Sequence, residues 1–538
     1  MSTGRFSRVY SAVALAAAAL LCGQAALAQV SAVRLRSGEL LGVVADGVAS
    51  YKGIPFAAPP VSDLRWKAPQ PVLPWRGLKR ADTYGPSCMQ DPSFAKLFES
   101  PAPISEDCLY LNVWTPAKSP SEKLPVMVWI YGGGFTGGMT SIPGYDGTKL
   151  AQKGVVLVSI AYRLGVFGFL AHPDLSRESG KGSGDYGLWD QIAGLRWVRA
   201  NIAAFGGDPQ RVTIFGESAG GMAVSMLAAS AQAKGLFQRA ISESGGNLGP
   251  PKKGTEGGAG PQLLESAEAV GKQFLDKLGA HDLRAARALS AQALMSAQGP
   301  GLATPFRPVL DGAVLPGDEY EMYQAGDFND TPVLIGTNSD EGGLFVKGPL
   351  TPAQFESQVR AAYGECADVI LAANPHATDA EALRSAQNLM RDSTFAWSTW
   401  AWAKLQSQKG QGKAYVYYFD HPTPQTPNGS SHAAEIGFVF RTLGGPGQGP
   451  SGITGPVSPE QRATSELLSS YWVNFAKTGD PNGPGLPSWP AFTVQSQQVM
   501  HLDAHPAAGP VPNLRELTAL DKYFAWRRQQ NKGARASH

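Results

Sequence analysis

The sequence predicts an α/β fold built on a large, mostly parallel sheet that is covered by helices on both faces. Two observations support this prediction: runs of apolar, β-branched residues recur along the chain, and segments with helical spacing lie between them. A strand that is apolar throughout is buried on both faces, and strands that alternate with helices favour parallel pairing. Because sites in such sheets gather at the carboxyl ends of the strands, we expect the chemically active residues directly after the apolar runs.

The expected elements are placed by these two patterns. Turn residues bound each apolar run, and the segments between the runs place their apolar residues on one face of a helix. The buried strands are expected at 125–131, 155–162, 211–215, 332–336 and 414–419, and helices at 187–205 and 219–229.

The glycine and proline content predicts many long, shaped loops. The chain has 538 residues, with 63 glycines and 41 prolines, more of both than an average protein.

Apolar segments resume after the Gly/Pro-rich stretches 245–260 and 444–455, so we expect these stretches to be loops of one packed body rather than linkers between domains. Length alone favours three or four domains. A single α/β domain often contains more residues than this length rule assumes, and we expect residues 29–538 to form a single domain.

The charges are nearly balanced, with 46 Lys+Arg against 44 Asp+Glu. A nucleic-acid-binding protein normally carries a basic excess or a basic stripe. We therefore expect no nucleic-acid partner; the charge balance leaves the chemistry open.

The first 28 residues predict a secretory signal peptide. Arg5 and Arg8 precede an apolar stretch at 11–21, and Ala26-Leu27-Ala28 has the small residues of a cleavage site. The apolar stretch is too short to span a bilayer, and no other segment is long and apolar enough to do so. We expect cleavage after Ala28 and a secreted or periplasmic protein, whose remaining chain has 44 basic and 44 acidic residues.

Four cysteines are too few for a disulfide scaffold, and Cys22 leaves with the signal peptide. In an oxidising compartment, Cys88 and Cys108 are close enough in sequence to close a surface loop. We expect Cys366 to be a small, buried apolar residue.

A Gly-x-Ser-x-Gly sequence lies between the expected strand 211–215 and the expected helix 219–229. A sharp turn between a strand and a helix exposes such a serine above the sheet edge, and the flanking glycines leave room for both elements. This context predicts Ser218 as a nucleophile rather than a chance match. The backbone amide of Ala219, at the helix start, is expected to face an oxyanion formed there.

Glycines at 132–134, 137 and 138 come directly after the expected strand 125–131. They satisfy the dinucleotide pattern G-x-G-x-x-G, which would indicate an oxidoreductase, but no helix opens at the glycines and Pro143 interrupts the next segment. A plain turn is a second alternative. We favour a loop of an acyl-transfer enzyme, in which residues without side chains let two amides approach a developing alkoxide.

A serine nucleophile needs a general base, usually histidine. His432 comes after the last strong strand, on a polar loop that leads into an apolar stretch, whereas most other histidines adjoin prolines. The acid should lie between the serine and the histidine in the chain. Asp340 and Glu341 both come after the strand 332–336, and the residues alone do not separate them.

Together these residues resemble the type-B carboxylesterase family of the α/β-hydrolase fold, which includes para-nitrobenzyl esterases, carboxylesterases and cholinesterases. The resemblance covers nearly the whole mature chain and is carried by the motifs at 51–57, 106–112, 131–135 and 215–221.

The resemblance implies a role for each candidate. The acid is the glutamate before a glycine in Asp-Glu-Gly, which is Glu341, and the base falls on His432 in a His-x-x-Glu-Ile context. The oxyanion amides fall on Gly133, Gly134 and Ala219.

The resemblance also implies a disulfide between Cys88 and Cys108 and an ion pair between Arg65 and Glu106. No metal or organic cofactor is implied. Cholinesterases carry a tryptophan inside this disulfide loop to hold choline. This sequence has only phenylalanines there, Phe94 and Phe98, which argues against a cation–π choline site.

The predicted function is a serine hydrolase that cleaves small carboxylic esters through an acyl-enzyme. An amidase, lactonase or thioesterase with the same triad and a non-catalytic binding protein on this fold are the alternatives. A cluster of aromatic residues is expected either to line a gorge or to pack in the core: Phe395, Trp397, Trp400 and Trp402.

Overall fold

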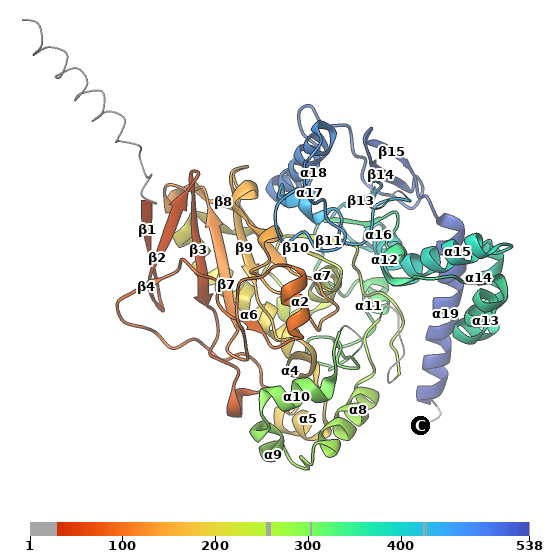
Figure 1. Ribbon diagram of the computed structural model, residues 1–538, viewed down its shortest axis with the longest axis horizontal. Helices are drawn as coiled ribbons and strands as arrows, with labels where there is room; N and C mark the ends of the chain where they lie inside the picture. Colours follow the sequence, from red (N-terminus) through yellow and green to blue (C-terminus); the bar gives the residue numbers. More distant parts are fainter. Residues whose placement is uncertain (1–28, 254–259, 302–303, 423–425, 427, 537–538) are drawn as a thin grey trace, which may run out of the picture.

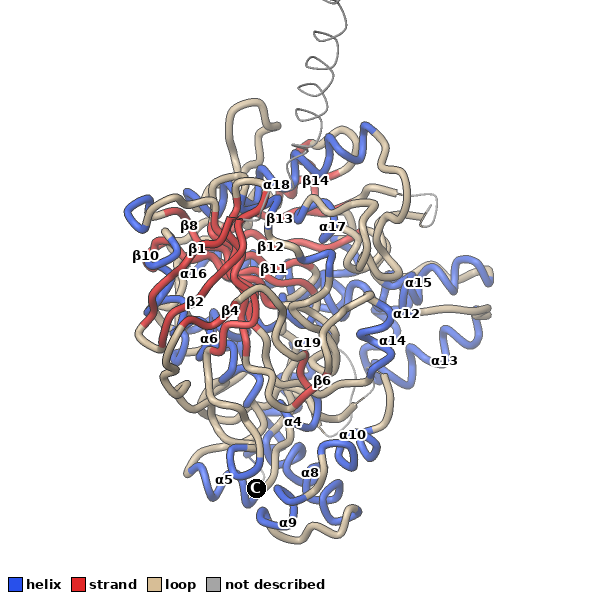
Figure 2. The backbone as a smooth tube through the Cα atoms, turned by 60° about the vertical axis from the view of Figure 1, so that its left-hand side comes forward, coloured by secondary structure: helices blue, strands red, loops and turns tan. Residues whose placement is uncertain are grey.

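A large twisted sheet runs through the protein, as the computed structural model shows (Figures 1 and 2). The structure describes residues 29–253, 260–301, 304–422, 426 and 428–536, and the predicted signal peptide lies outside them. Within the described chain the sheet has 13 strands in the order β1-β2-β3-β7-β9-β8-β10-β11-β12-β13-β14-β15, and β4 pairs with β2.

The strands of this sheet are β1 (Gln29–Leu35), β2 (Gly38–Ala45), β3 (Val48–Pro55), β4 (Leu78–Arg80), β7 (Tyr110–Thr115), β8 (Leu124–Ile130), β9 (Val156–Ile160), β10 (Gly207–Glu217), β11 (Arg239–Glu243), β12 (Val333–Asn338), β13 (Ala414–Phe419), β14 (Gln498–Leu502) and β15 (Ala507–Pro510). The short strands β5 (Ser87–Cys88) and β6 (Ile104–Ser105) form a separate pair.

The parallel part of the sheet confirms the predicted fold class. The pairs from β9 through β8, β10, β11, β12 and β13 to β14 are all parallel. All five predicted strands lie in this part; β13 has the predicted bounds, and β10 extends beyond its predicted ends on both sides. Strand β11 was not predicted, because its five residues include an arginine and a glutamate. Antiparallel strands extend the sheet at both edges, and their mixed polarity hid them from the apolar-run criterion.

The α-helices are α2 (Pro92–Leu97), α3 (Thr148–Ala151), α4 (Gly165–Phe169), α5 (Pro173–Ser179), α6 (Tyr186–Asn201), α7 (Ala219–Ala229), α8 (Leu264–Lys277), α9 (Leu283–Ala288), α10 (Ala291–Gln298), α11 (Glu319–Ala325), α12 (Gly342–Phe345), α13 (Pro352–Tyr363), α14 (Ala367–Ala373), α15 (Asp379–Arg391), α16 (Trp397–Lys409), α17 (Ile436–Phe440), α18 (Pro459–Thr478) and α19 (Leu514–Ala536). Short 3₁₀ helices are η1 (Ser62–Leu64), η2 (Pro120–Glu122), η3 (Pro143–Tyr145), η4 (Ile202–Phe205), η5 (Ala231–Ala233) and η6 (Gly364–Cys366), and η7 (Asp392–Ala396) is a π-helix.

The two predicted helices both form. The segment 219–229 is α7, and the segment 187–205 is divided between α6 and η4. Most residues of α6 and α7 are buried, as expected for helices that cover a central sheet. No helix in the described part of the chain is long and apolar enough to cross a membrane.

Three of the four aromatic residues in the cluster seen in the sequence pack in the core. Trp397, Trp400 and Trp402 of α16 are buried in the core, and the Trp397 indole donates a hydrogen bond to Asp521 of α19 at 3.0 Å. These three residues therefore pack in the interior rather than line a gorge.

A disulfide bond joins Cys88 and Cys108, as predicted. It closes a loop that carries α2 and its aromatic residues. Arg65 forms the expected ion pair with Glu106, at 2.6 Å. Cys366 is half-buried rather than buried, because it lies in the short η6 helix near the surface.

Candidate active site

Ser218 occupies a sharp turn between the end of β10 and the start of α7. Its φ of 55° and ψ of −123° lie outside the regions that a residue with a side chain normally adopts. The Ser218 amide donates to the carbonyl of Glu243 on β11, at 2.9 Å, which helps to hold the turn. Strained backbone of this kind persists only where the surrounding structure enforces it.

Two glycines allow this turn to form. A side chain on Gly220 would clash with the carbonyl group of Ile130 at the end of β8, and a Cβ on Gly216 would lie 2.5 Å from the same oxygen. The turn is therefore pressed against the neighbouring strand, which explains the glycines on both sides of Ser218.

The glycine-rich loop after β8 lies against the serine turn. A Cβ on Gly132 would lie 2.8 Å from a carboxylate oxygen of Glu217 and 3.1 Å from the Cβ of Ser218. Gly133, Gly134 and Phe135 all have positive φ angles, of 106°, 63° and 62°. The loop leads into the short η3 helix rather than into the long helix of a dinucleotide site.

His432 and Glu341 meet behind the serine turn. The Nδ1 atom of His432 lies 2.5 Å from a carboxylate oxygen of Glu341, and both side chains are buried. The other oxygen of Glu341 accepts hydrogen bonds from the Ser244 hydroxyl, at 2.5 Å, and from the backbone amide of Asn338, at 2.8 Å. With both oxygens bonded, the Glu341 carboxylate is fixed in position and holds one nitrogen of the imidazole ring.

The two adjacent acids of the sequence have different surroundings. Asp340 forms an ion pair with Arg384 of α15, at 2.5 Å, and is half-buried. Glu341, the next residue, is fully buried and reaches His432. The geometry thus brings together His432 and Glu341, and not His432 and Asp340.

The second nitrogen of His432 faces the serine turn. Its Nε2 atom lies 3.2 Å from a carboxylate oxygen of Glu217, the residue before Ser218. The imidazole also stacks on Phe395, with ring centroids 4.7 Å apart. Burial lowers the pKa of His432, but the carboxylates of Glu217 and Glu341 more than offset this effect and raise it to about 9.

Further buried carboxylates surround the imidazole of His432. Burial raises the pKa of Glu217 to about 8, against the opposing effect of His432, and raises that of Glu435 to about 7. Glu435 accepts a hydrogen bond from the Asn338 side chain at 2.5 Å, and Glu243 accepts one from the Trp472 indole at 2.8 Å. In the described residues, no group of three or more His, Cys, Asp or Glu side chains has the arrangement of a metal site.

The sequence patterns did not predict Glu217 or Ser244 as members of this site, and they did not decide the place of Phe395. Glu217 was visible only as a variable position of the Gly-x-Ser-x-Gly motif, although its place beside the nucleophile was a usable signal. Ser244 comes directly after the unpredicted strand β11, and Phe395 was left open between gorge and core.

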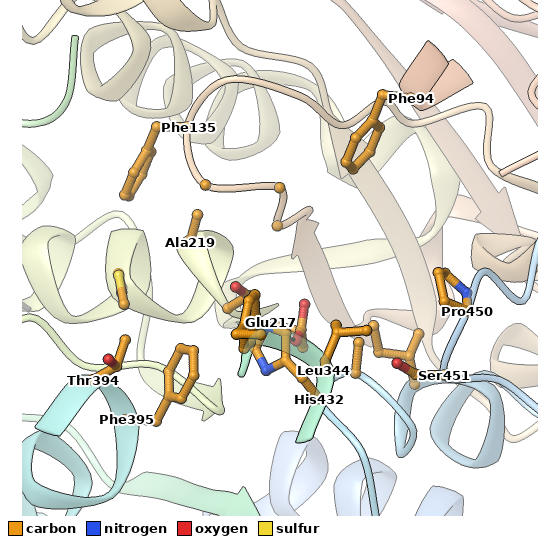
Figure 3. A pocket seen from close by; sticks show the side chains of 18 of the residues that line it. Phe94, Phe135, Glu217, Ala219, Leu344, Thr394, Phe395, His432, Pro450 and Ser451 are labelled. Carbon is orange, nitrogen blue, oxygen red and sulfur yellow. Dashed lines mark ion pairs between the residues drawn. The ribbon is translucent and has the colours of Figure 1, made fainter. Parts of the chain in front are cut away.

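A cavity of about 860 Å³ opens above the serine turn (Figure 3). Five predicted site residues line this cavity: Ser218, His432, Gly133, Gly134 and Ala219. The structure thus brings these five residues together. Five phenylalanines contribute to the remaining lining: Phe94, Phe98, Phe135, Phe345 and Phe395. An apolar cavity with a few convergent polar groups is typical of a small-molecule site.

Residues 29–519 match the Carboxylesterase family. The chain belongs to the carboxylesterase family. It is 38% identical to the para-nitrobenzyl esterase of Bacillus subtilis (strain 168), over 88% of this chain and 94% of that protein. It is 37% identical to the fumonisin B1 esterase of Sphingopyxis macrogoltabida, over 85% of this chain and 84% of that protein. The chain is therefore an enzyme of this family, in which its relatives are named esterases.

Solved structures of esterases share the fold of this carboxylesterase. One structure of a PNB esterase superposes with a TM-score of 0.79 at 36% identity, covering 91% of this chain and 99% of that one. The predicted family and α/β-hydrolase fold are therefore confirmed.

Proposed function

We propose that the enzyme hydrolyses carboxylic esters through an acyl-enzyme formed on Ser218, with His432 as general base and Glu341 as its orienting acid. The observation that carries this proposal is the placement of His432. Glu341 holds its Nδ1 atom at 2.5 Å, its Nε2 atom faces the turn that exposes Ser218, and serine and histidine line one cavity. Ester hydrolysis by the Ser218→Ala variant tests this assignment, because alanine has no atom that could carry the acyl group.

The reaction proceeds in two halves. His432 takes the hydroxyl proton as the Ser218 oxygen attacks the ester carbonyl, and it then gives that proton to the departing alcohol. Water, deprotonated by His432, next attacks the acyl-serine and releases the carboxylic acid. Glu341 keeps the imidazole in the tautomer that leaves Nε2 free to accept a proton, and it stabilises the imidazolium that forms.

The amides of Gly133, Gly134 and Ala219 are proposed to bind the oxyanion of each tetrahedral intermediate. All three residues line the cavity beside Ser218, and Ala219 is the first residue of α7, where the helix dipole favours negative charge. Each such donor contributes about 3 kcal/mol to transition-state stabilisation in enzymes of this type.

Replacing Glu217 with glutamine is expected to move the acidic limb of the kcat/KM–pH profile to lower pH. His432 must be neutral to accept the serine proton, so activity rises as pH passes through the pKa of the free enzyme's histidine. The Glu217 carboxylate raises that pKa, and the amide of Glu217→Gln removes its negative charge. A pH profile for a neutral 4-nitrophenyl ester, between about pH 5 and 10 so as to span the ordinary histidine pKa, measures the shift.

The control is Glu356→Gln on the exposed face of α13, which removes an equal charge from a surface ion pair with Arg360. Its profile is expected to match that of the unmodified enzyme. An acidic limb that stays in place, or moves to higher pH, in Glu217→Gln would contradict the role given to Glu217.

We also propose that residues 1–28 are a secretory signal peptide removed after Ala28, and that residues 29–538 act as one catalytic domain in the periplasm or outside the cell. The charged, apolar and small-residue segments of the N-terminus support the leader. The Cys88–Cys108 disulfide supports an oxidising compartment.

A further inference from the structure

The loop that carries two of the proposed oxyanion amides contains no helix or strand of its own. Residues 132–138 leave β8 and turn back on themselves, and the amides of Thr136 and Gly137 donate to the carbonyl of Gly133 at 3.1 and 3.0 Å. A donor stabilises an oxyanion only when it is held at hydrogen-bond distance from the place where the charge forms. Contacts from outside the loop must therefore keep its amides in place.

The returning end of the loop lies directly on its beginning. A Cβ on Gly138 would lie 2.4 Å from the carbonyl oxygen of Gly132 and 2.4 Å from the ring of Tyr131. A Cβ on Gly133 would lie 2.3 Å from the carbonyl oxygen of Gly137. Because these backbones are in close contact, a displacement of Gly138 would also displace the residues that carry the amides.

The side chain of Gln90 holds this returning end. Its carbonyl oxygen accepts a hydrogen bond from the backbone amide of Gly138 at 3.0 Å, and its NH₂ group donates to the carbonyl of the same residue at 2.8 Å. Gln90 thus engages both backbone polar groups of Gly138, as a neighbouring strand would. Only 2% of Gln90 is exposed, so water cannot easily take the place of either bond.

The disulfide loop fixes Gln90 in turn. Gln90 lies two residues after Cys88, and its NH₂ group also donates to the carbonyl of Cys88 at 3.1 Å. Phe94, on α2 of the same loop, packs against the glycine loop, since a Cβ on Gly137 would lie 2.9 Å from its ring. The disulfide loop therefore braces the glycine loop at two points.

The residue type at position 90 is explained by these bonds. Gln90 is not among the described residues that line the cavity, so it does not reach a bound substrate. A buried amide costs free energy unless its polar atoms are bonded, and an apolar side chain of the same length would fill the space without that cost. What glutamine adds is the pair of hydrogen bonds to Gly138.

We propose that Gln90 is a positioning residue, which acts through Gly138 to keep the amides of Gly133 and Gly134 aimed at the oxyanion. The proposal rests on the proposed function and adds a residue to its machinery. The oxyanion forms only as the ester carbonyl is attacked, so an interaction with it stabilises the transition state more than the bound substrate. Loss of the Gln90 amide should therefore lower kcat and leave KM nearly unchanged.

Two variants at position 90 test the proposal. Gln90→Met has nearly the same length but no amide, whereas Gln90→Asn keeps the amide on a side chain that is one methylene too short to reach Gly138. Both are expected to lower kcat on 4-nitrophenyl butanoate by at least about tenfold, with KM within a few-fold, because a misplaced oxyanion donor loses much of its effect.

A pair of ketones separates positioning from a merely structural role. With an alkyl trifluoromethyl ketone, the Ser218 oxygen bonds to the carbonyl carbon, His432 takes the serine proton, and the carbonyl oxygen becomes an oxyanion. The matching methyl ketone binds without forming a stable adduct. In both variants the inhibition constant of the trifluoromethyl ketone should rise by about the factor by which kcat falls, while that of the methyl ketone should stay the same.

Gln406→Met is the matched control. Gln406 of α16 is also buried, and its NH₂ group also donates to a glycine carbonyl, that of Gly412, at 3.0 Å, but it is not one of the described residues that line the cavity. This variant is expected to show the kcat and both inhibition constants of the unmodified enzyme. Thermal unfolding of all three variants measures the loss of stability that removal of a buried amide causes at each position.

Unchanged kcat in either Gln90 variant, an equal change of the two inhibition constants, or an equal fall of kcat in Gln406→Met would overturn the proposal. Failure of the proposed function gives a different result: the unmodified enzyme would bind the trifluoromethyl ketone no more tightly than the methyl ketone, and Ser218→Ala would hydrolyse the ester as fast as the unmodified enzyme.

Discussion

Ser218→Ala is expected to lower kcat/KM for a 4-nitrophenyl ester by at least about 10⁴-fold, a typical effect of removing the nucleophile from a serine hydrolase. The variant retains the cavity and the amides of the glycine loop but cannot form the acyl-enzyme. Because alanine and serine have the same Cβ, the strained turn at φ 55° should form equally well in both. The loss should therefore appear in kcat, measured by release of 4-nitrophenol.

Two controls make this result specific. The midpoint of thermal unfolding of Ser218→Ala should match that of the unmodified enzyme. Ser451→Ala removes a hydroxyl from another serine that lines the same cavity, and it should change kcat/KM by no more than a few-fold. Full activity in Ser218→Ala, or a comparable loss in both variants, would show that Ser218 is not the nucleophile.

Glu341→Gln is expected to reduce kcat by about 10³- to 10⁴-fold, as replacement of the buried acid does in other triads. Glutamine fills the same space but can present its NH₂ group to His432. The imidazole then carries its proton on Nε2, where it cannot accept the proton of Ser218. Single-turnover kinetics of acylation with a 4-nitrophenyl ester measures this loss directly.

Asp340→Asn is the matched control for this variant. It makes the same chemical change at the adjacent residue, whose carboxylate pairs with Arg384 on α15 and does not contact His432 in the structure. Its acylation rate should stay within a few-fold of the unmodified enzyme's, with at most a modest loss of stability. If Asp340→Asn lost more activity than Glu341→Gln, the acid would be misassigned.

Local patterns were sufficient to predict the central strands and the serine turn. The turn needs glycines within two residues of Ser218, and the strand and helix beside it are short-range signals. By contrast, Asp340 and Glu341 are neighbours that differ only in what they meet after folding: Arg384 for one, and His432 for the other. For Glu341 that partner lies 91 residues away in the chain, so the residues alone left the choice open and the family resemblance was needed.

The unpredicted parts of the site share one physical cause. Ser244 reaches Glu341 because β11 places it at the centre of the sheet, and β11 is too short and too polar to stand out in the sequence. Phe395 stacks on His432 from a π-helix, while the tryptophans of the adjoining α16 turn into the core. In both cases, the direction of a side chain is decided by tertiary packing.

Covalent labelling of Ser218 tests the central claim most directly. The enzyme is incubated with a fluorophosphonate, which reacts with activated serines, and the modified peptide is identified by mass spectrometry. We expect a single phosphonylated peptide that contains Ser218, no labelling of Ser218→Ala, and much slower labelling of Glu341→Gln. Labelling of a different side chain, or undiminished ester hydrolysis by fully labelled enzyme, would contradict the account.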